Sequence, residues 1–180
     1  PDPRAVAVCE ALRPAWEGRP QGGDGTGAGV AFQQYEVEFA YAAAYAEVQV
    51  DSASGRVRVT RVVVAHDCGL IINPDGLRNQ IEGNVVQGVS RTLKEEVGYS
   101  GDRVTTLVWE TSEFHPGKQY EVLRFNEVPE IETILINRPD QPPLGAGEPT
   151  IGLMGGAIGN AVFAATGKRL RTLPLTPERV

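Results

Sequence analysis

The sequence has few of the residues that usually build metal clusters and covalent cross-links. Its 180 residues include two cysteines, Cys9 and Cys68, and two histidines, His66 and His115. Two isolated cysteines exclude a disulfide framework, and they cannot provide the four thiolates that an iron–sulfur cluster generally needs. Neither a CxxC pair nor an HxxxH pair is present. We therefore expect no metal ion that is held mainly by protein side chains.

Positive charge and long apolar runs are also scarce. The chain carries 17 lysines and arginines against 23 aspartates and glutamates, a formal net charge of −6. This acidic balance argues against nucleic acid or an anionic membrane surface as the main partner. No apolar run approaches the roughly 20 residues that a membrane-spanning helix needs, and no signal-peptide pattern is present. The first residue is not methionine, and we expect the chain to be a fragment or one piece of a split subunit.

Glycine and proline, by contrast, are plentiful, with 21 and 13 residues. One glycine run lies at residues 22–29. A phosphate-binding loop is one interpretation, but no strand precedes the run and no Gly-Lys-Ser/Thr sequence ends it. A linker that follows a short helix broken at Pro14 is the favoured interpretation. We therefore predict an N-terminal helix and linker over residues 1–29 and a single domain over residues 30–180.

Alternating apolar residues and turn-forming residues predict several strands and hairpins. They are a strand at 30–50 with a bend near 42–44, a turn at 52–55, a strand at 56–65, a hairpin around 98–102, a turn at 115–118, and strands at 120–125 and 131–136. Helical spacing predicts two longer helices, at 73–93 and after Pro149. Strands and helices in this order predict the α+β class, with antiparallel or mixed sheets and packed helices.

The helix expected at 73–93 carries two kinds of side chain on opposite faces. The apolar face consists of Leu77, Ile81, Val85, Val89 and Leu93. The opposite face is a polar stripe of Gln80, Asn84, Gln87 and Arg91. Amides both donate and accept hydrogen bonds, which suits a ligand rich in heteroatoms. Gln80 is thus a candidate ligand contact, and a plain solvated face is the alternative.

A second glycine-rich stretch, from Pro142 to Gly167, combines a tight loop, one carboxylate and a helix. Gly145 and Gly147 allow the backbone to approach a ligand closely and are candidate ligand contacts. Glu148 precedes a proline, which holds it in an extended conformation in front of the helix. A carboxylate fixed in this way can serve as a general base. The alternative is that Glu148 only caps its helix.

Several stretches carry a family resemblance. The sequence HDCGLIINPDGLRNQIEGNVVQG begins at His66, and PPLGAGEP begins at Pro142. Further similar segments run from Leu123 to Glu132 and from Ala165 to Pro174. In this order and spacing they resemble the molybdenum hydroxylases, the xanthine dehydrogenase and aldehyde oxidase family. The nearest resemblance is to the molybdopterin-binding large subunit of the isoquinoline 1-oxidoreductase type, and it covers nearly all of residues 28–180.

The resemblance implies a role for each matching residue. Glu148 corresponds to the catalytic glutamate of the family, and Gln80 corresponds to a glutamine that lies against the pterin cofactor. Asp67, Cys68 and Gly69 correspond to a loop near the dinucleotide form of that cofactor. The implied reaction is hydroxylation with an oxygen atom taken from water, in which the glutamate is the base that removes a proton.

The resemblance also implies cofactors and partners. Molybdenum would be carried by molybdopterin, in the cytosine dinucleotide form, without a side-chain ligand, which agrees with the missing Cys/His cluster. Family large subunits are several times longer than this chain, and residues 115–119 resemble a small insertion. The implied partners are the rest of the subunit, a small subunit with two [2Fe–2S] clusters, and a small-molecule substrate, an N-heterocycle or an aldehyde. The alternative is an assembly or scaffold module that binds no cofactor without its missing half.

Overall fold

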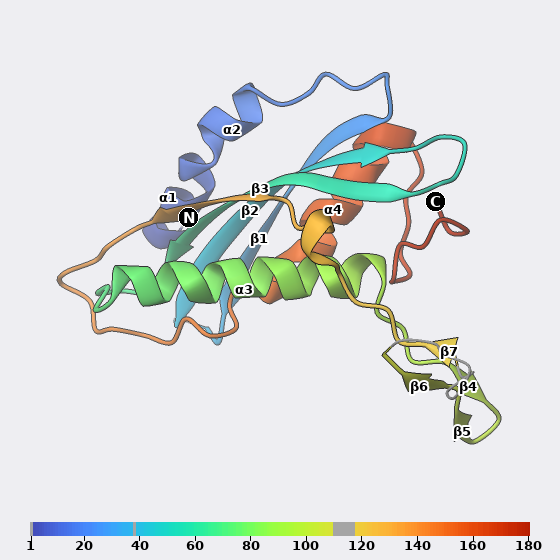
Figure 1. Ribbon diagram of the computed structural model, residues 1–180. Coiled ribbons are helices and arrows are strands. Elements are labelled where there is room, and N and C mark those ends of the chain that lie inside the picture. The colour runs from blue at the N-terminus through green and yellow to red at the C-terminus, as the bar shows by residue number, and fades with distance from the viewer. Residues whose placement is uncertain (1, 38, 110–117) are drawn as a thin grey trace.

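The fold is known from a computed structural model, which describes residues 2–37, 39–109 and 118–180. Its main elements are α1 (Pro3–Ala11), α2 (Arg13–Glu17), β1 (Thr26–Tyr35), β2 (Ala40–Val50), β3 (Val57–Asp67), α3 (Pro74–Leu93), the short 3₁₀ helix η1 (Phe125–Glu127), β8 (Glu130–Leu135) and α4 (Ile151–Thr166). Four short strands are β4 (Tyr99–Ser100), β5 (Arg103–Val104), β6 (Thr106–Val108) and β7 (Lys118–Gln119). Figure 1 shows β4 to β7 projecting from the body of the molecule.

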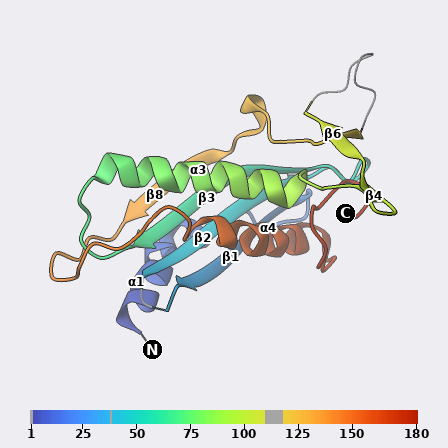
Figure 2. The same cartoon turned by 90° about the horizontal axis from the view of Figure 1, so that it is seen from below.

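The body is one four-stranded sheet covered by helices on both faces. Its strand order is β1-β2-β3-β8, with α3 and α4 packed on one face and α1 on the other. Figure 2 shows α3 and α4 side by side along the strands. β1, β2 and β3 pair antiparallel, whereas β3 and β8 pair parallel. The prediction of an α+β fold with a mixed sheet is therefore confirmed.

The strand directions decide which loops are neighbours. β1, β3 and β8 all run the same way, because each differs from β2 in direction. Their carboxyl ends, at Tyr35, Asp67 and Leu135, therefore lie at one edge of the sheet. The loop that leads from β3 to α3 and the loop that leads from β8 to α4 start side by side at this edge.

A bulge in β3 decides which side chains face which layer. The pairing of β2 with β3 skips Thr60, and such an extra residue shifts the alternation of the strand by one. Val59 before the bulge and Val62 after it both pack in the cluster under α3 and α4. Alternation then continues, so His66 contacts the start of α4 while Asp67 contacts α1 on the other face.

The apolar face predicted for α3 is confirmed. Its members Leu77, Ile81, Val85, Val89 and Leu93 are all buried. They pack with Met154, Ile158 and Val162 of α4 against the sheet. The helix begins where the sequence predicts, because Asn73 accepts a hydrogen bond from Gly76 N and Pro74 occupies the first turn.

Two glycines of the first glycine run lie inside β1 rather than in a linker. A Cβ at Gly27 would come within 2.2 Å of Ala161 O, and a Cβ at Gly29 within 2.3 Å of Ala157 O. The backbone of α4 thus fills the space beside both residues, which contradicts a phosphate-binding loop at this point. The linker ends at Gly25, and β1 crosses the expected boundary between residues 29 and 30. That domain boundary itself stays a prediction.

Three further expectations of secondary structure are corrected. The strand expected at 30–50 is two strands, of which β1 ends at Tyr35 and β2 begins at Ala40, and the bend expected at 42–44 falls inside β2. Residues 120–125 do not form a strand, and the hairpin around 98–102 is reduced to β4 and β5. The break between the first helices lies at Leu12, and Pro14 sits in the first turn of α2.

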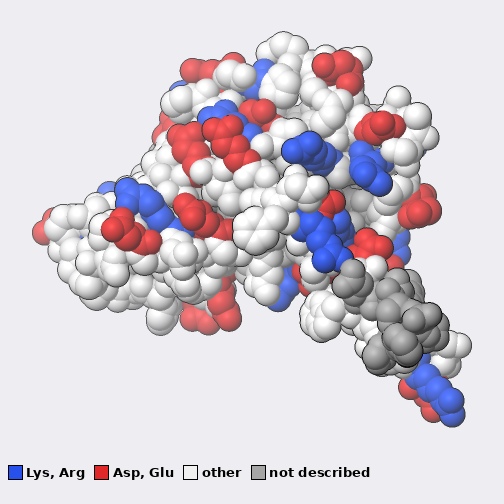
Figure 3. All heavy atoms as spheres, viewed as in Figure 1, with Lys and Arg blue, Asp and Glu red and all other residues white. Residues whose placement is uncertain are grey.

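Other features of the chain bear on its surroundings. The expected turn and insertion at 115–119 lie largely outside the described residues. No helix in the described ranges is long and apolar enough to cross a membrane. Figure 3 shows acidic and basic side chains interspersed over the visible face, without a large patch of one sign.

Candidate functional site

Glu148 lies in the loop that runs from β8 to α4, at the sheet edge where β1, β3 and β8 end. Its side chain is exposed, and α4 begins three residues later at Ile151. The carboxylate accepts a hydrogen bond of 2.6 Å from the hydroxyl of Tyr35, at the end of β1. This hydrogen bond, with smaller contributions from burial and charge, raises the pKa of Tyr35 to about 12. The tyrosine therefore stays a hydrogen-bond donor at neutral pH.

The expected alternative, that Glu148 only caps its helix, does not match the contacts. The residue at the N-cap position is Thr150, and its side chain makes no capping hydrogen bond. The first helical amide, Ile151 N, donates to Asn84 Oδ1 at 3.0 Å and to the backbone oxygen of Glu148 at 3.2 Å. The Glu148 carboxylate therefore does not cap α4; it accepts the hydrogen bond from Tyr35 and is otherwise accessible from solvent.

A hollow of about 480 Å³ opens beside this loop, between the start of α3 and residues 143–147. Its lining includes Cys68, Gln80, Leu144 and Gly147. The structure therefore brings together Gln80, the glycine loop and the segment after β3, which the sequence places far apart. A second hollow of about 560 Å³ continues along α3, and Gln80 borders both.

The glycine loop is open on its outer side. A Cβ at Gly145 would meet no atom within 4 Å, and a Cβ at Gly147 would lie 3.7 Å from Gln80 Nε2. Gln80 itself is exposed on α3. Gly147 and the Gln80 amide thus border the same hollow, which suits a ligand that needs donors and acceptors rather than charge.

Asp67 has a different position from the other predicted contacts. Its carboxylate is fully buried and accepts hydrogen bonds from Arg4, Arg138 and Gly69 N. Burial alone would raise the pKa of Asp67, but these hydrogen bonds outweigh it and hold the pKa below its usual value. The charge is thus paired on two sides, and Asp67 ties α1 to the loop after β8.

Cys68 and Gly69 connect the two loops directly. Leu144 N donates to Cys68 O at 2.9 Å, and Arg138 N donates to Gly69 O at 3.1 Å. Gly69 has a φ of +80°, and a Cβ there would lie 2.1 Å from Pro142 O. Burial, followed by the charge of Asp67, raises the pKa of the Cys68 thiol. It is therefore a neutral thiol at the floor of the hollow.

His66 lies beneath the site, and its ring is fully buried. Nδ1 is 3.3 Å from Thr150 Oγ1, and within the described chain Nε2 has no hydrogen-bond partner. Burial lowers the pKa of His66 from 6.5 to about 4. The folded protein therefore contains the neutral ring at any ordinary pH.

We expect this histidine to make the chain acid-sensitive. The unfolded chain binds a proton at His66 below about pH 6.5 and the folded chain only near pH 4, so stability falls as the pH drops through this window. The free energy of unfolding should decrease by roughly 2 kcal/mol between pH 8 and pH 5. Urea unfolding at both pH values measures this. In His66→Gln, which does not titrate, the decrease should be largely absent; an equal decrease in both proteins would contradict the assignment.

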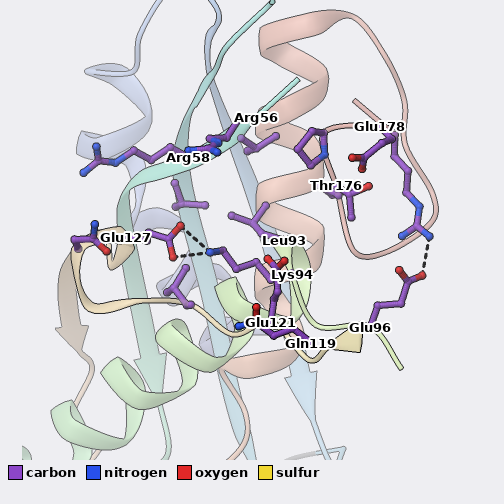
Figure 4. A pocket seen from close by; sticks show the side chains of 17 residues that line it. Arg56, Arg58, Leu93, Lys94, Glu96, Gln119, Glu121, Glu127, Thr176 and Glu178 are labelled. Atoms are coloured by element: carbon purple, nitrogen blue, oxygen red, sulfur yellow. Dashed lines mark hydrogen bonds and ion pairs between the residues drawn. The ribbon is translucent and has the colours of Figure 1, made fainter. Parts of the chain in front are cut away.

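A third hollow, of about 840 Å³, lies elsewhere, and none of the predicted site residues lines it. It is bordered by the start of β3, the end of α3, η1 and residues 175–179 (Figure 4). Ion pairs cross it, Lys94 with Glu127 at 2.6 Å and Arg179 with Glu96 at 2.7 Å. Charges that neutralise one another in this way join segments of the chain, and they do not indicate a ligand of one sign.

The described residues contain no group of three or more His, Cys, Asp or Glu side chains that could hold a metal ion. The exposed amide of Gln80 and the glycine loop at Gly147 border one hollow, and the exposed Glu148 carboxylate belongs to the residue that follows Gly147. The sequence family described as molybdopterin cofactor-binding domain matches residues 15–115. The chain belongs to this family, that of the molybdenum hydroxylases.

Known relatives agree with this assignment. One of the subunits of nicotinate dehydrogenase from Pseudomonas putida is 40% identical over 99% of this chain and 16% of its own length. The beta chain of isoquinoline 1-oxidoreductase from Brevundimonas diminuta is 34% identical over 97% of this chain and 21% of its own length. The crystal structure of quinoline 2-oxidoreductase from Pseudomonas putida 86 superposes with a TM-score of 0.66 at 30% identity, over 78% of this chain and 18% of that one. The chain thus spans about a fifth or less of these relatives.

Sequence reasoning missed several residues of the site. Tyr35 lies 113 positions from Glu148, and nothing in its surroundings in the sequence connects the two. Arg4 and Arg138 were not connected with Asp67. Asn84 was visible as an amide of the polar stripe of α3, but it is buried and contacts the Glu148 loop instead of solvent.

Proposed function

We propose that this chain supplies the catalytic base and one wall of the cofactor site of a molybdopterin-dependent hydroxylase. Glu148 is the base, and the implied reaction places an oxygen atom from water on a small molecule. The observation that carries the proposal is the exposed Glu148 carboxylate, which Tyr35 holds and which directly follows Gly147, a residue that borders the hollow together with Gln80. Relatives named for nicotinate and isoquinoline favour an N-heterocycle over an aldehyde as substrate.

The residues present fit a bound pterin. Gln80, Gly145 and Gly147 are exposed and can supply hydrogen bonds to its heteroatoms. The segment Asp67–Gly69 would support the dinucleotide end, proposed here to be a cytosine nucleotide; Asp67 does so through its clamp on the loop. When bound, the cofactor supplies the molybdenum and the redox chemistry. The chain itself supplies the proton acceptor and holds it in place.

The electrons of such a reaction need a route away from the site. Cys9 is exposed and Cys68 is buried, and two separate thiols cannot hold an iron–sulfur cluster. We therefore propose a small subunit with two [2Fe–2S] clusters as partner, next to the remaining part of the molybdopterin-binding subunit.

Cofactor analysis tests the proposal. We expect the 180-residue chain alone to retain no molybdenum after gel filtration, because the hollow between Gln80 and Gly147 is open and encloses little of a ligand's surface. The complete subunit should retain molybdenum and pterin together. Gln80→Ala should lower that retention several-fold. Gln49→Ala, near the end of β2 that lies away from the Glu148 loop, should not lower it.

Two results would contradict the proposal. A complete subunit without molybdenum or pterin would favour the assembly or scaffold module. Stoichiometric molybdenum in the chain alone would show that its site needs no second wall.

A further inference from the structure

Asn84 connects the middle of α3 with the loop that carries Glu148. Its Nδ2 donates to Gly147 O at 2.7 Å and to Gln80 O, one turn earlier in its own helix, also at 2.7 Å. Its Oδ1 accepts from Ile151 N at 3.0 Å. The side chain is 8% exposed, so water does not compete strongly for these contacts.

The three contacts leave one orientation for the amide. Two backbone oxygens face the nitrogen, and one backbone N–H faces the oxygen. A flipped amide would place its oxygen against two carbonyl oxygens and its NH₂ group against the N–H of Ile151. All hydrogen-bonding groups at this point are therefore paired in only one arrangement.

The positions of the two loop contacts matter more than their number. Gly147 precedes Glu148 directly, and Ile151 is the first residue of α4. Asn84 thus holds the backbone on both sides of the carboxylate. Amides in the first turn of a helix have no partner within the helix, and Ile151 N has two outside it, Glu148 O at 3.2 Å and Asn84 Oδ1 at 3.0 Å. Thr150 gives no such side-chain bond, and Asn84 provides it from a different helix.

We propose that Asn84 is a positioning residue for catalysis, which fixes the Glu148 carboxylate relative to α3 and to the cofactor contact Gln80. Gln80 O and Gly147 O share the two hydrogens of one amide, so the distance between the α3 backbone and the loop is set by a single rigid group. This inference rests on the proposed role of Glu148 as the base. Misplacement of a reacting group by about 1 Å can cost on the order of 100-fold in rate.

The test uses the complete molybdopterin-binding subunit with its cofactor and partner. Asn84→Ala removes all three contacts. Asn84→Asp keeps the shape and the acceptor for Ile151 N but replaces the donor that holds Gly147 O and Gln80 O. Asn160→Ala is the matched control: Asn160 also bonds two other segments, through Val30 O and Arg169, but near the far end of α4.

We expect both Asn84 variants to lower kcat at least tenfold with molybdenum content unchanged and KM changed less than threefold. Hydrogen exchange in the peptide that contains Ile151 should be faster in Asn84→Ala, which removes the acceptor of Ile151 N, and less affected in Asn84→Asp, which keeps it. The Asn160→Ala subunit should show neither change. In Asn84→Asp, activity relative to the parent should rise as the pH is lowered, because a protonated carboxyl again donates to the loop.

Two outcomes would rule out a positioning role. Normal kcat and normal exchange at Ile151 in both variants would overturn it. A lower melting temperature with normal kcat would leave Asn84 a structural residue only. If Asn84→Ala does not fold, the isosteric Asn84→Asp decides alone. The exchange measurement does not depend on catalysis. A Glu148 variant that keeps full activity would therefore reject the proposed function, while the exchange rate at Ile151 would still show whether Asn84 holds the loop.

Discussion

Glu148→Gln in the complete enzyme should retain the cofactor and lose turnover by a factor of roughly 10²–10⁴, the usual contribution of a general base. The amide has nearly the same volume, and its oxygen can still accept the hydrogen bond that Tyr35 donates at 2.6 Å. The loop and the tyrosine therefore stay in place. Only the ability to take up a proton is removed.

The measurement is steady-state turnover divided by molybdenum content, so that loss of cofactor is not mistaken for loss of the base. Glu17→Gln is a suitable control, since Glu17 is exposed at the end of α2. It changes the net charge by the same amount and should keep normal turnover. Near-normal turnover of Glu148→Gln with full cofactor content would show that another group accepts the proton.

The contacts of Glu148 suggest how a solvent-exposed carboxylate is kept in one place. Tyr35 at the end of β1 holds the side chain, and Asn84 in α3 holds the backbone. Glu36 and Val37, directly after Tyr35, have φ values of +43° and +64°. Non-glycine residues in this region are strained and tend to cluster at functional sites. The strained residues thus directly follow Tyr35, the residue that holds the Glu148 carboxylate.

Sequence reasoning succeeded where the causes of structure are local. The apolar positions of α3 repeat every four residues, Asn73 and Pro74 mark its start, and all of this is confirmed. The loop that contains Glu148 was found through its glycines and proline, whose backbone preferences are equally local.

It failed where the cause lies in a distant part of the chain. The segment between β1 and β2, residues 36–39, contains no glycine, proline or asparagine. The alanines that follow it show no alternation that would mark the start of β2. The parallel pairing of β3 with β8 brings the loops of the site to one edge of the sheet, but no short-range pattern in the sequence predicts this pairing. The contact between Tyr35 and Glu148 accompanies the packing of α4 on β1, which neither periodicity nor spacing could indicate.

Gly29 is the clearest case of a residue that is required by a contact with a distant part of the chain. Its substitution should therefore have a large effect on stability. A Cβ there would lie 2.3 Å from Ala157 O and 2.4 Å from Ala161 N, both in the backbone of α4. A helix backbone cannot move aside as a flexible side chain does. Gly29→Ala should therefore push α4 off β1 and destabilise the chain by about 3 kcal/mol or more, at the upper end for overpacked cores.

Gly159 offers a matched comparison in α4 itself. A Cβ at this position would meet nothing within 4 Å, and alanine favours a helix over glycine by roughly 0.5–1 kcal/mol. Gly159→Ala should therefore raise the free energy of unfolding by about that amount. The same chemical change, one methyl group, is thus expected to act in opposite directions at a tightly packed position and at an open one.

Urea unfolding of the 180-residue chain, followed by circular dichroism, measures both effects. The slope of the transition should stay the same for Gly159→Ala, since the surface exposed on unfolding is unchanged. If Gly29→Ala proves too unstable to purify, Gly29→Ala combined with Gly159→Ala should recover part of the loss, because the two positions act through different causes. Equal stability of Gly29→Ala and the parent chain would mean that α4 does not pack on β1 at this distance, and the position of the Glu148 loop at its start would then need to be revised.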